Sequence, residues 1–170
     1  MKQLIAYYSR ADENYVRGSL KYISKGNTEV LAETLKKLTD ADLFKIEQKI
    51  PYSKSYNDCI EEAKRDQQSN ARPALTDYLT DISDYDVIFL GYPNYWGTVP
   101  MAVKTFLDSY DFTGKTIIPF CTHEGSGLGR SVQDIKSIVK TADVKNGFAI
   151  YGSRAKTSEA ELKKFLSELK

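Results

Sequence analysis

Four short runs of almost wholly apolar residues recur along the chain, and they constrain its fold more than any other feature. They are residues 4–8, 87–90, 117–121 and 148–151. Apolar runs of this length without alternation are typical of strands buried on both faces of a sheet. A fifth run, residues 43–47, alternates more, which favours a strand at the edge of a sheet. We therefore expect five strands.

Stretches with helical spacing separate these runs. Apolar residues recur every three or four positions from Val30 to Leu38, Val103 to Tyr110, Val132 to Val139 and Leu162 to Leu169. A weaker pattern covers residues 58–68, and Ser158 with Glu161 resembles a capping box opening the last helix. Strand and helix alternate, which predicts an α/β fold with a doubly wound parallel sheet and helices on both faces. At 170 residues we expect a single domain, residues 1–170.

The charge balance and the cysteines exclude several classes of partner and location. The 24 Lys and Arg residues nearly cancel 23 Asp and Glu residues, leaving a formal net charge of +1. No basic stripe stands out, so we expect neither nucleic acid nor a membrane as a partner. No apolar stretch approaches a membrane span, and residues 1–10 lack a signal-peptide pattern. Cys59 and Cys121 are far apart without a CxxC partner, which favours a cytoplasmic protein.

The most unusual residues follow the ends of predicted strands, where a doubly wound sheet binds its ligands. The first such loop ends in Gly26-Asn27-Thr28 as a helix begins. Hydroxyls and backbone N–H groups at the positive end of a helix suit a phosphate. The alternative is an ordinary N-cap made by Asn27 or Thr28. The loop matches neither the Walker A nor the GxGxxG pattern.

The second loop, residues 91–100, holds three aromatic residues and two glycines between a strand and a helix. An aromatic ring can stack on a planar ligand while neighbouring loop amides reach its polar edge. The alternative is that Tyr92, Tyr95 and Trp96 only cover the end of the core. This loop therefore predicts one wall of a pocket for a flat ligand.

The third loop, residues 122–129, offers small residues that let the backbone approach such a ligand closely. His123 is the only histidine in the chain, and a single histidine in a polar loop is more often structural than catalytic. Without a second histidine, CxxC or HExxH spacing, we expect no metal site.

Through the second and third loops the chain resembles the flavodoxin family, and more narrowly the flavodoxin-like proteins that carry YPxxWGTxP and CTHxGSGLG loops. The resemblance spans nearly the whole chain. It implies a three-layer α/β/α fold around a five-stranded parallel sheet in the order 2-1-3-4-5, with FMN as the cofactor. It also implies that the protein transfers electrons through the bound flavin.

The same resemblance implies a set of cofactor-binding residues. The phosphate site would comprise Ser9, Gly26, Asn27 and Thr28; one wall of the isoalloxazine pocket Pro93, Asn94, Tyr95, Trp96 and Gly97; and the other wall Thr122, His123, Glu124, Gly125, Ser126 and Gly127. Which aromatic residue stacks on the ring stays open.

Two departures from the family pattern bear on function. An insertion from Arg10 to Lys25 opens the compact phosphate loop, and Lys25 replaces the usual hydroxyl residue. This insertion folds over the phosphate end, forms a partner surface or is a solvated excursion, and we favour the excursion. The near-neutral charge also differs from the strongly acidic electron carriers of the family, in which negative surroundings disfavour an anionic reduced flavin.

Three functions remain open from the sequence. The first is electron transfer to a redox partner protein through an exposed flavin edge. The second is an NAD(P)H-dependent quinone or small-molecule oxidoreductase, which needs room beside the flavin and often a dimer, so both monomer and homodimer stay open. The third is a binding or regulatory module without a flavin. The flavin carries the chemistry, so no protein residue is expected to be catalytic, and Cys59 and Cys121 are interpreted as packing residues.

Overall fold

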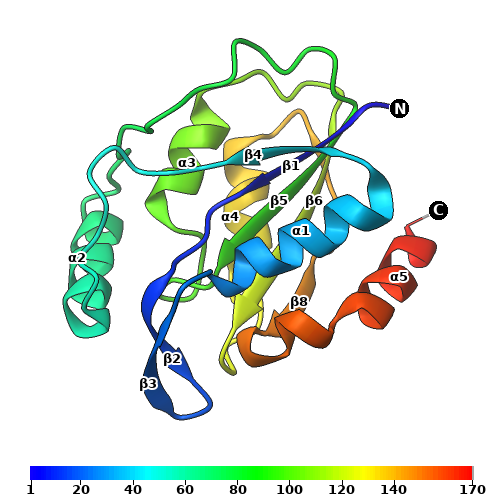
Figure 1. Cartoon of the computed structure of the whole chain (residues 1–170). Coiled ribbons are helices and arrows are strands. Elements are labelled where there is room, and N and C mark those ends of the chain that lie inside the picture. The colour runs from blue at the N-terminus through cyan, green and yellow to red at the C-terminus, as the bar shows by residue number, and fades with distance from the viewer. Residues whose placement is uncertain (170) are drawn as a thin grey trace.

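A parallel sheet runs through the centre of the computed structural model, which describes residues 1–169 (Figure 1). Its strands are β1 (Gln3–Tyr7), β4 (Asp42–Lys45), β5 (Val87–Pro93), β6 (Thr116–His123), β7 (Asp143–Val144) and β8 (Phe148–Tyr151). The order is β4-β1-β5-β6, with β7 and β8 both paired to β6, and every pairing is parallel. The predicted order 2-1-3-4-5 is confirmed, with β4 as an edge strand.

The last predicted strand, residues 148–151, is confirmed as β8, and the two-residue strand β7, which was not predicted, precedes it on the same side of β6. β7 pairs with the start of β6 at Thr116 and Ile117, and β8 pairs with its end from Phe120 to His123. The gap between β7 and β8 lies opposite Ile118 and Pro119. Because proline has no N–H to donate, the ladder on this side of β6 is interrupted.

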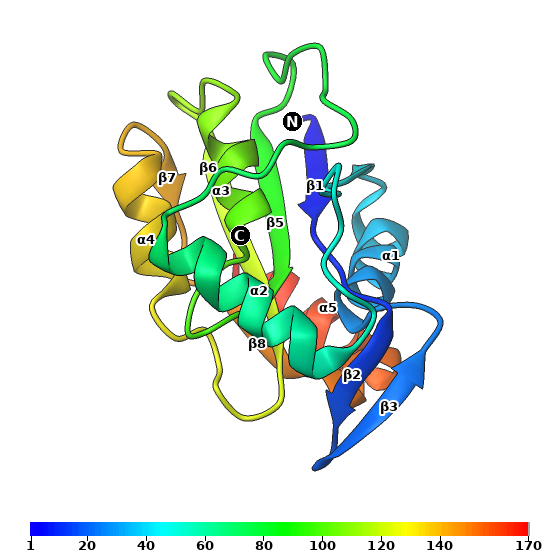
Figure 2. The same cartoon turned by 90° about the vertical axis from the view of Figure 1, so that its left-hand side faces the viewer.

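Helices cover both faces of the sheet, as predicted (Figures 1 and 2). Successive strand residues point to opposite faces, so each strand contributes to two cores. On one face, Ile5 and Phe89 pack with α1 (Asn27–Thr39) and α5 (Glu159–Glu168). On the other, Leu4 and Ile88 pack with α3 (Met101–Asp108) and α4 (Ser131–Ile138). Across residues 1–169, no helix combines the length and the apolar character needed to cross a membrane.

The helix α2 (Tyr56–Gln68) lies beside α3 and the N-terminal insertion rather than along the length of the sheet (Figure 2). It buries only the small residues Cys59 and Ala63. The weak apolar pattern over residues 58–68 therefore predicted a real helix.

The insertion folds as a β-hairpin of β2 (Asp12–Val16) and β3 (Ser19–Ile23). Arg17 and Gly18 join the strands, and both have positive φ, 50° and 86°. Two such residues favour the tight turn that matches the twist of a hairpin. Hydrogen bonds attach the hairpin to the start of α2 and to the segment before it: the amide of Glu13 donates to Lys54 O at 3.3 Å, and the Glu13 carboxylate accepts the Tyr56 amide at 2.8 Å. The insertion is thus an ordered element rather than a purely solvated excursion.

The predicted capping box of Ser158 and Glu161 is wrong. A 3₁₀ helix, η1 (Gly152–Thr157), directly precedes α5, so the backbone of Ser158 (ψ 2°) is not in the extended conformation of a capping residue. Its hydroxyl donates instead to Ala155 O at 2.6 Å, and Glu161 pairs with Arg154. The N-terminus of α5 therefore has no side-chain cap.

Candidate functional site

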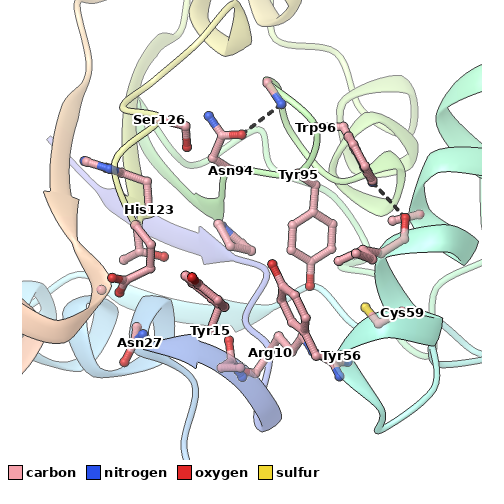
Figure 3. Close-up of a pocket in the computed structure, with 18 residues that line it drawn as sticks. Arg10, Tyr15, Asn27, Tyr56, Cys59, Asn94, Tyr95, Trp96, His123 and Ser126 are labelled. Carbon is pink, nitrogen blue, oxygen red and sulfur yellow. Dashed lines mark hydrogen bonds between the residues drawn. The ribbon is translucent and has the colours of Figure 1, made fainter. Parts of the chain in front are cut away.

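The carboxyl ends of β1, β5 and β6 surround a cavity of about 430 Å³ (Figure 3). Ten of the residues predicted as cofactor-binding line it: Asn27, Pro93, Asn94, Tyr95, Trp96, Gly97, Thr122, His123, Glu124 and Ser126. Five others are not among its lining residues: Ser9, Gly26, Thr28, Gly125 and Gly127. The structure therefore brings all three predicted loops to one place.

A tight turn shapes the loop after β5. Tyr95 and Thr98 form an isolated antiparallel bridge, and each amide donates to the other's carbonyl, at 2.8 and 3.2 Å. Trp96 and Gly97 stand at the corner with φ values of 52° and 85°. A positive φ is unusual for a tryptophan, and such strain is typical of functional loops. The turn directs the Trp96 side chain away from the sheet toward α2.

The indole of Trp96 is held against α2 (Figure 3). Its Nε1 donates to Ile60 O at 2.7 Å, and the Lys64 ammonium lies 5.1 Å from the ring centre. The side chain nevertheless stays 42% exposed. Trp96 therefore joins the loop to α2 at the rim of the cavity.

Asn94 connects the loops after β5 and β6. Its Nδ2 donates to Gly127 O at 2.9 Å, while its Oδ1 accepts the amide of Gly97 at 2.9 Å. The first bond joins the two loops, and the second fixes the turn within the loop after β5, so both polar atoms of the side chain are used.

The loop after β6 carries His123 and Glu124. His123 Nδ1 accepts the Gly125 amide at 2.9 Å, and the ring lies 4.7 Å from that of Tyr151. Burial lowers the pKa of His123, and the nearby Glu124 charge opposes that shift only in part. The two Glu124 oxygens accept the backbone amides of Ser153 (3.2 Å) and Arg17 (3.4 Å). The carboxylate of Glu124 therefore contacts both η1 and the hairpin.

The start of α1 presents free amide donors. Ser9 Oγ accepts the Glu29 amide at 3.0 Å, whereas the amides of Asn27 and Thr28 find no acceptor in the described part of the chain. Gly26 precedes the helix as its capping residue, so neither Asn27 nor Thr28 is the N-cap. A Cβ on Gly26 would lie 2.6 Å from Arg10 O, which explains the glycine. The Thr28 side chain is buried and bonds Thr122 Oγ1 at 2.8 Å.

Eight lining residues were not predicted: Arg10, Asn14, Tyr15, Tyr56, Cys59, Ile60, Ala63 and Gly152. The first three belong to the insertion, and the next four come from α2. Tyr15 and Tyr56 stack with ring centres 6.1 Å apart and planes at 29°. The sequence carried a signal for the α2 residues, because Tyr56, Cys59, Ile60 and Ala63 follow i, i+3, i+4, i+7 spacing on one helix face.

Phenol and thiol groups gather beneath the α2 side of the cavity. The Tyr95 hydroxyl is buried and has no hydrogen-bond partner within residues 1–169, and its ring packs edge-on against Tyr8 at 5.8 Å. Tyr8 donates its own hydroxyl to Gln48 Oε1 at 2.9 Å. Burial raises the pKa values of Tyr8, Tyr95 and Cys59 above their ordinary values. These groups are therefore neutral at pH 7.

Comparison with known proteins gives two kinds of match. A family model described as flavodoxin matches residues 19–169. Among curated proteins, none matches this sequence. A solved structure from Bacteroides eggerthii DSM 20697, assigned as a flavoprotein, is 28% identical with a TM-score of 0.78, and the match covers 98% of this chain and 96% of that chain. One from Bacteroides uniformis ATCC 8492, assigned likewise, is 25% identical with a TM-score of 0.75, covering 95% and 97%.

A third structure shares the fold. It is a flavoprotein from Lactobacillus acidophilus NCFM in complex with FMN, 21% identical with a TM-score of 0.64, and the match covers 92% of this chain and 97% of that chain. The family model covers almost all of the described residues, including α1 and the loops after β5 and β6. The chain belongs to the flavodoxin family.

Proposed function

We propose that this protein binds one FMN in the cavity and transfers electrons through it. The observation that carries the proposal is the convergence of three elements on one cavity: free amides at the start of α1, the aromatic loop after β5 and the small-residue loop after β6. A volume of about 430 Å³ is in the range of cofactor sites. The FMN complex of the Lactobacillus acidophilus flavoprotein supports the same ligand.

The residues present fit the chemistry of FMN. A phosphate needs N–H donors without protein acceptors, which Asn27 and Thr28 offer at a positive helix end. An isoalloxazine ring needs aromatic faces and polar loop groups, which Tyr95, Asn94 and Ser126 offer. The cofactor-binding set we propose is Ser9, Gly26, Asn27, Thr28, Pro93, Asn94, Tyr95, Trp96, Gly97, Thr122, His123, Glu124, Gly125, Ser126 and Gly127.

When bound, FMN supplies the electron transfer, and the protein binds it, orients it and excludes water from one side. Asn94 holds the two ring-facing loops at a fixed separation. Ser9 and the Thr28–Thr122 hydroxyl pair position the start of α1 against β6. We propose a redox partner protein or a small-molecule acceptor as the electron acceptor.

A charge placed at the start of α1 tests the proposal. Asn27→Asp keeps the side-chain shape and suits a helix N-terminus, yet adds a negative charge where the phosphate would bind. We expect FMN to bind at least about tenfold more weakly to this variant, since like charges repel, while riboflavin, which lacks the phosphate, changes by less than about twofold. Equal weakening of both ligands would contradict the phosphate assignment.

Asn57→Asp is the matched control. Asn57 is exposed in the first turn of α2 and is not among the residues that line the cavity, so the same substitution there adds the same charge at another helix N-terminus. We expect wild-type affinity for both flavins. A reductive titration of the loaded protein, followed by mixing with NADH or NADPH and a quinone, then separates a carrier from an oxidoreductase: rapid NAD(P)H oxidation indicates the enzyme.

A further inference from the structure

A single cationic side chain lines the α2 side of the cavity without an acidic partner. Arg10 stands at the root of the hairpin, half-buried, with its guanidinium beside the α2 residues of the cavity wall (Figure 3). Its Nε donates to Glu13 O at 3.2 Å and its Nη2 to Lys54 O at 3.0 Å. Neither acceptor is charged, and none of the ion pairs found in residues 1–169 includes Arg10. The charge is thus held in place but not cancelled.

The other charged group of the cavity lies on the opposite side. Glu124 belongs to the loop after β6, where backbone amides of Ser153 and Arg17 satisfy its oxygens. The lining groups near Arg10 are neutral: burial raises the pKa values of Cys59, Tyr95 and Tyr56. The Arg10 charge opposes each of these shifts, so its field reaches the groups beneath and beside the cavity. Among the side chains that line the cavity, the positive charge of Arg10 and the negative charge of Glu124 therefore belong to different walls.

We propose that Arg10 tunes the cofactor by stabilising the negative charge that bound FMN gains on reduction, so that it raises the reduction potential of the flavin. This inference rests on the proposed function. A two-electron reductant and one proton from solvent convert the neutral oxidised ring into a reduced ring with one net negative charge. A fixed cation in a partly desolvated wall favours the reduced form, because Coulomb interactions weaken less there than in water. Backbone carbonyls hold the guanidinium in advance, so no reorganisation is needed when the charge appears.

The same contacts also give Arg10 a structural role, since they tie the hairpin to Lys54 just before α2. Two substitutions separate the roles. Arg10→Gln removes the charge but retains a hydrogen-bond donor, whereas Arg10→Lys retains the charge but loses the paired donor geometry. If Arg10 tunes the flavin, the reduction potential changes only when the charge is removed. If its role is structural, the potential changes when the hydrogen-bond geometry is lost.

Arg17→Gln is the matched control. Arg17 lies in the turn of the same hairpin, is exposed and is not among the lining residues of the cavity. The substitution Arg17→Gln changes the net charge of the protein by the same amount as Arg10→Gln. An effect of overall charge would appear equally in both variants.

The experiment loads each full-length protein with FMN, measures the affinity for oxidised FMN, and then measures the midpoint potential by dithionite titration against a reference dye. For Arg10→Gln we expect binding of reduced FMN to weaken about tenfold relative to oxidised FMN, which corresponds to a potential about 30 mV lower for two electrons. Arg10→Lys and Arg17→Gln should stay near the wild-type potential. Binding of oxidised FMN shows in each case that the variant is folded.

Three results would overturn the inference: an unchanged potential in Arg10→Gln, an equal drop in Arg10→Lys, or an equal drop in Arg17→Gln. In all three the protein still binds FMN, so the proposed function stands. If the wild-type protein binds no FMN, the proposed function fails and this inference fails with it. If Arg10→Gln does not fold, Arg10→Lys decides alone. A midpoint potential of Arg10→Lys below that of the wild type overturns the inference, and a wild-type potential supports it.

Discussion

The two walls of the cavity differ in how they are held. The loop wall, residues 93–97 and 122–127, continues directly from the buried strands β5 and β6 and is tied across by Asn94. The hairpin wall, formed by Arg10, Asn14, Tyr15 and the α2 residues, joins segments more than forty residues apart. No residue from 10 to 26 belongs to either hydrophobic core, and Tyr15 remains 43% exposed. The difference indicates that the loop wall is preformed by the fold, whereas the hairpin wall is an addition to it.

Replacing an asparagine in each wall compares how much each wall contributes to FMN binding, and the largest effect is expected for Asn94 in the loop wall. Asn94→Ala removes the hydrogen bond that joins the two loops and the one that fixes the turn after β5. At about 1 kcal/mol each, we expect FMN to bind roughly 30-fold more weakly. Fluorescence titration of the apoprotein with FMN measures this change.

Asn14→Ala is the matched variant in the hairpin wall. The Asn14 Nδ2 donates to Arg10 O at 3.1 Å and Ala11 O at 3.2 Å, so its loss loosens the root of the hairpin only. We expect an affinity change below about threefold, because these bonds are local and partly exposed. A loss as large as that of Asn94→Ala would remove the distinction between the walls.

A smaller effect is expected when the hairpin is removed. Replacing residues 12–23 by two glycines is geometrically simple, since Asp12 and Ile23 are cross-strand partners. The apoprotein should lose only about 1 kcal/mol in free energy of unfolding, because α2 loses the Glu13 acceptor at Tyr56 while both cores stay intact. Thermal and urea unfolding measure the change.

Gly91→Ala provides the contrast within β5. A Cβ at this position would lie 2.2 Å from the ring of the buried Phe120. We expect a loss of about 1 to 3 kcal/mol from overpacking. A hairpin deletion that destabilises the protein more than Gly91→Ala would show that the hairpin is part of the folding unit.

The smallest effect concerns His123 in the loop wall. Burial lowers its pKa, so the unfolded chain binds a proton more readily than the folded chain. Stability should therefore fall as the pH drops through the unfolded value of about 6.5 and level off below the folded pKa. His123→Asn, whose side-chain oxygen can still accept the Gly125 amide, should flatten this part of the pH profile. Identical profiles for the two proteins, from urea unfolding at pH 8 and pH 5, would contradict this explanation.

Most of the fold could be predicted from the sequence because the strands are continuous apolar runs and their order follows from the family resemblance. The short strand β7 could not be, since two residues make no recognisable pattern and the gap between β7 and β8 depends on Pro119 in β6, which faces them. The capping box at Ser158 failed because η1 changes the backbone at the point where the helix begins.

The loop wall was predictable because its unusual residues are contiguous in sequence and follow strand ends. The hairpin wall was not, because Tyr15 meets Tyr56, and Arg10 meets Lys54, only through tertiary packing. Trp96 lines the cavity, but its contact with Ile60 on α2 arises from a positive φ that the sequence does not reveal.

Titration of the purified apoprotein with FMN measures directly whether this cavity binds the cofactor. Flavin absorbance and fluorescence are followed as FMN is added, with riboflavin in a parallel titration. We expect saturation at one FMN per chain, a perturbed visible spectrum and weaker binding of riboflavin. A protein that stays colourless after incubation with excess FMN and removal of free flavin would contradict the proposal that this cavity binds FMN.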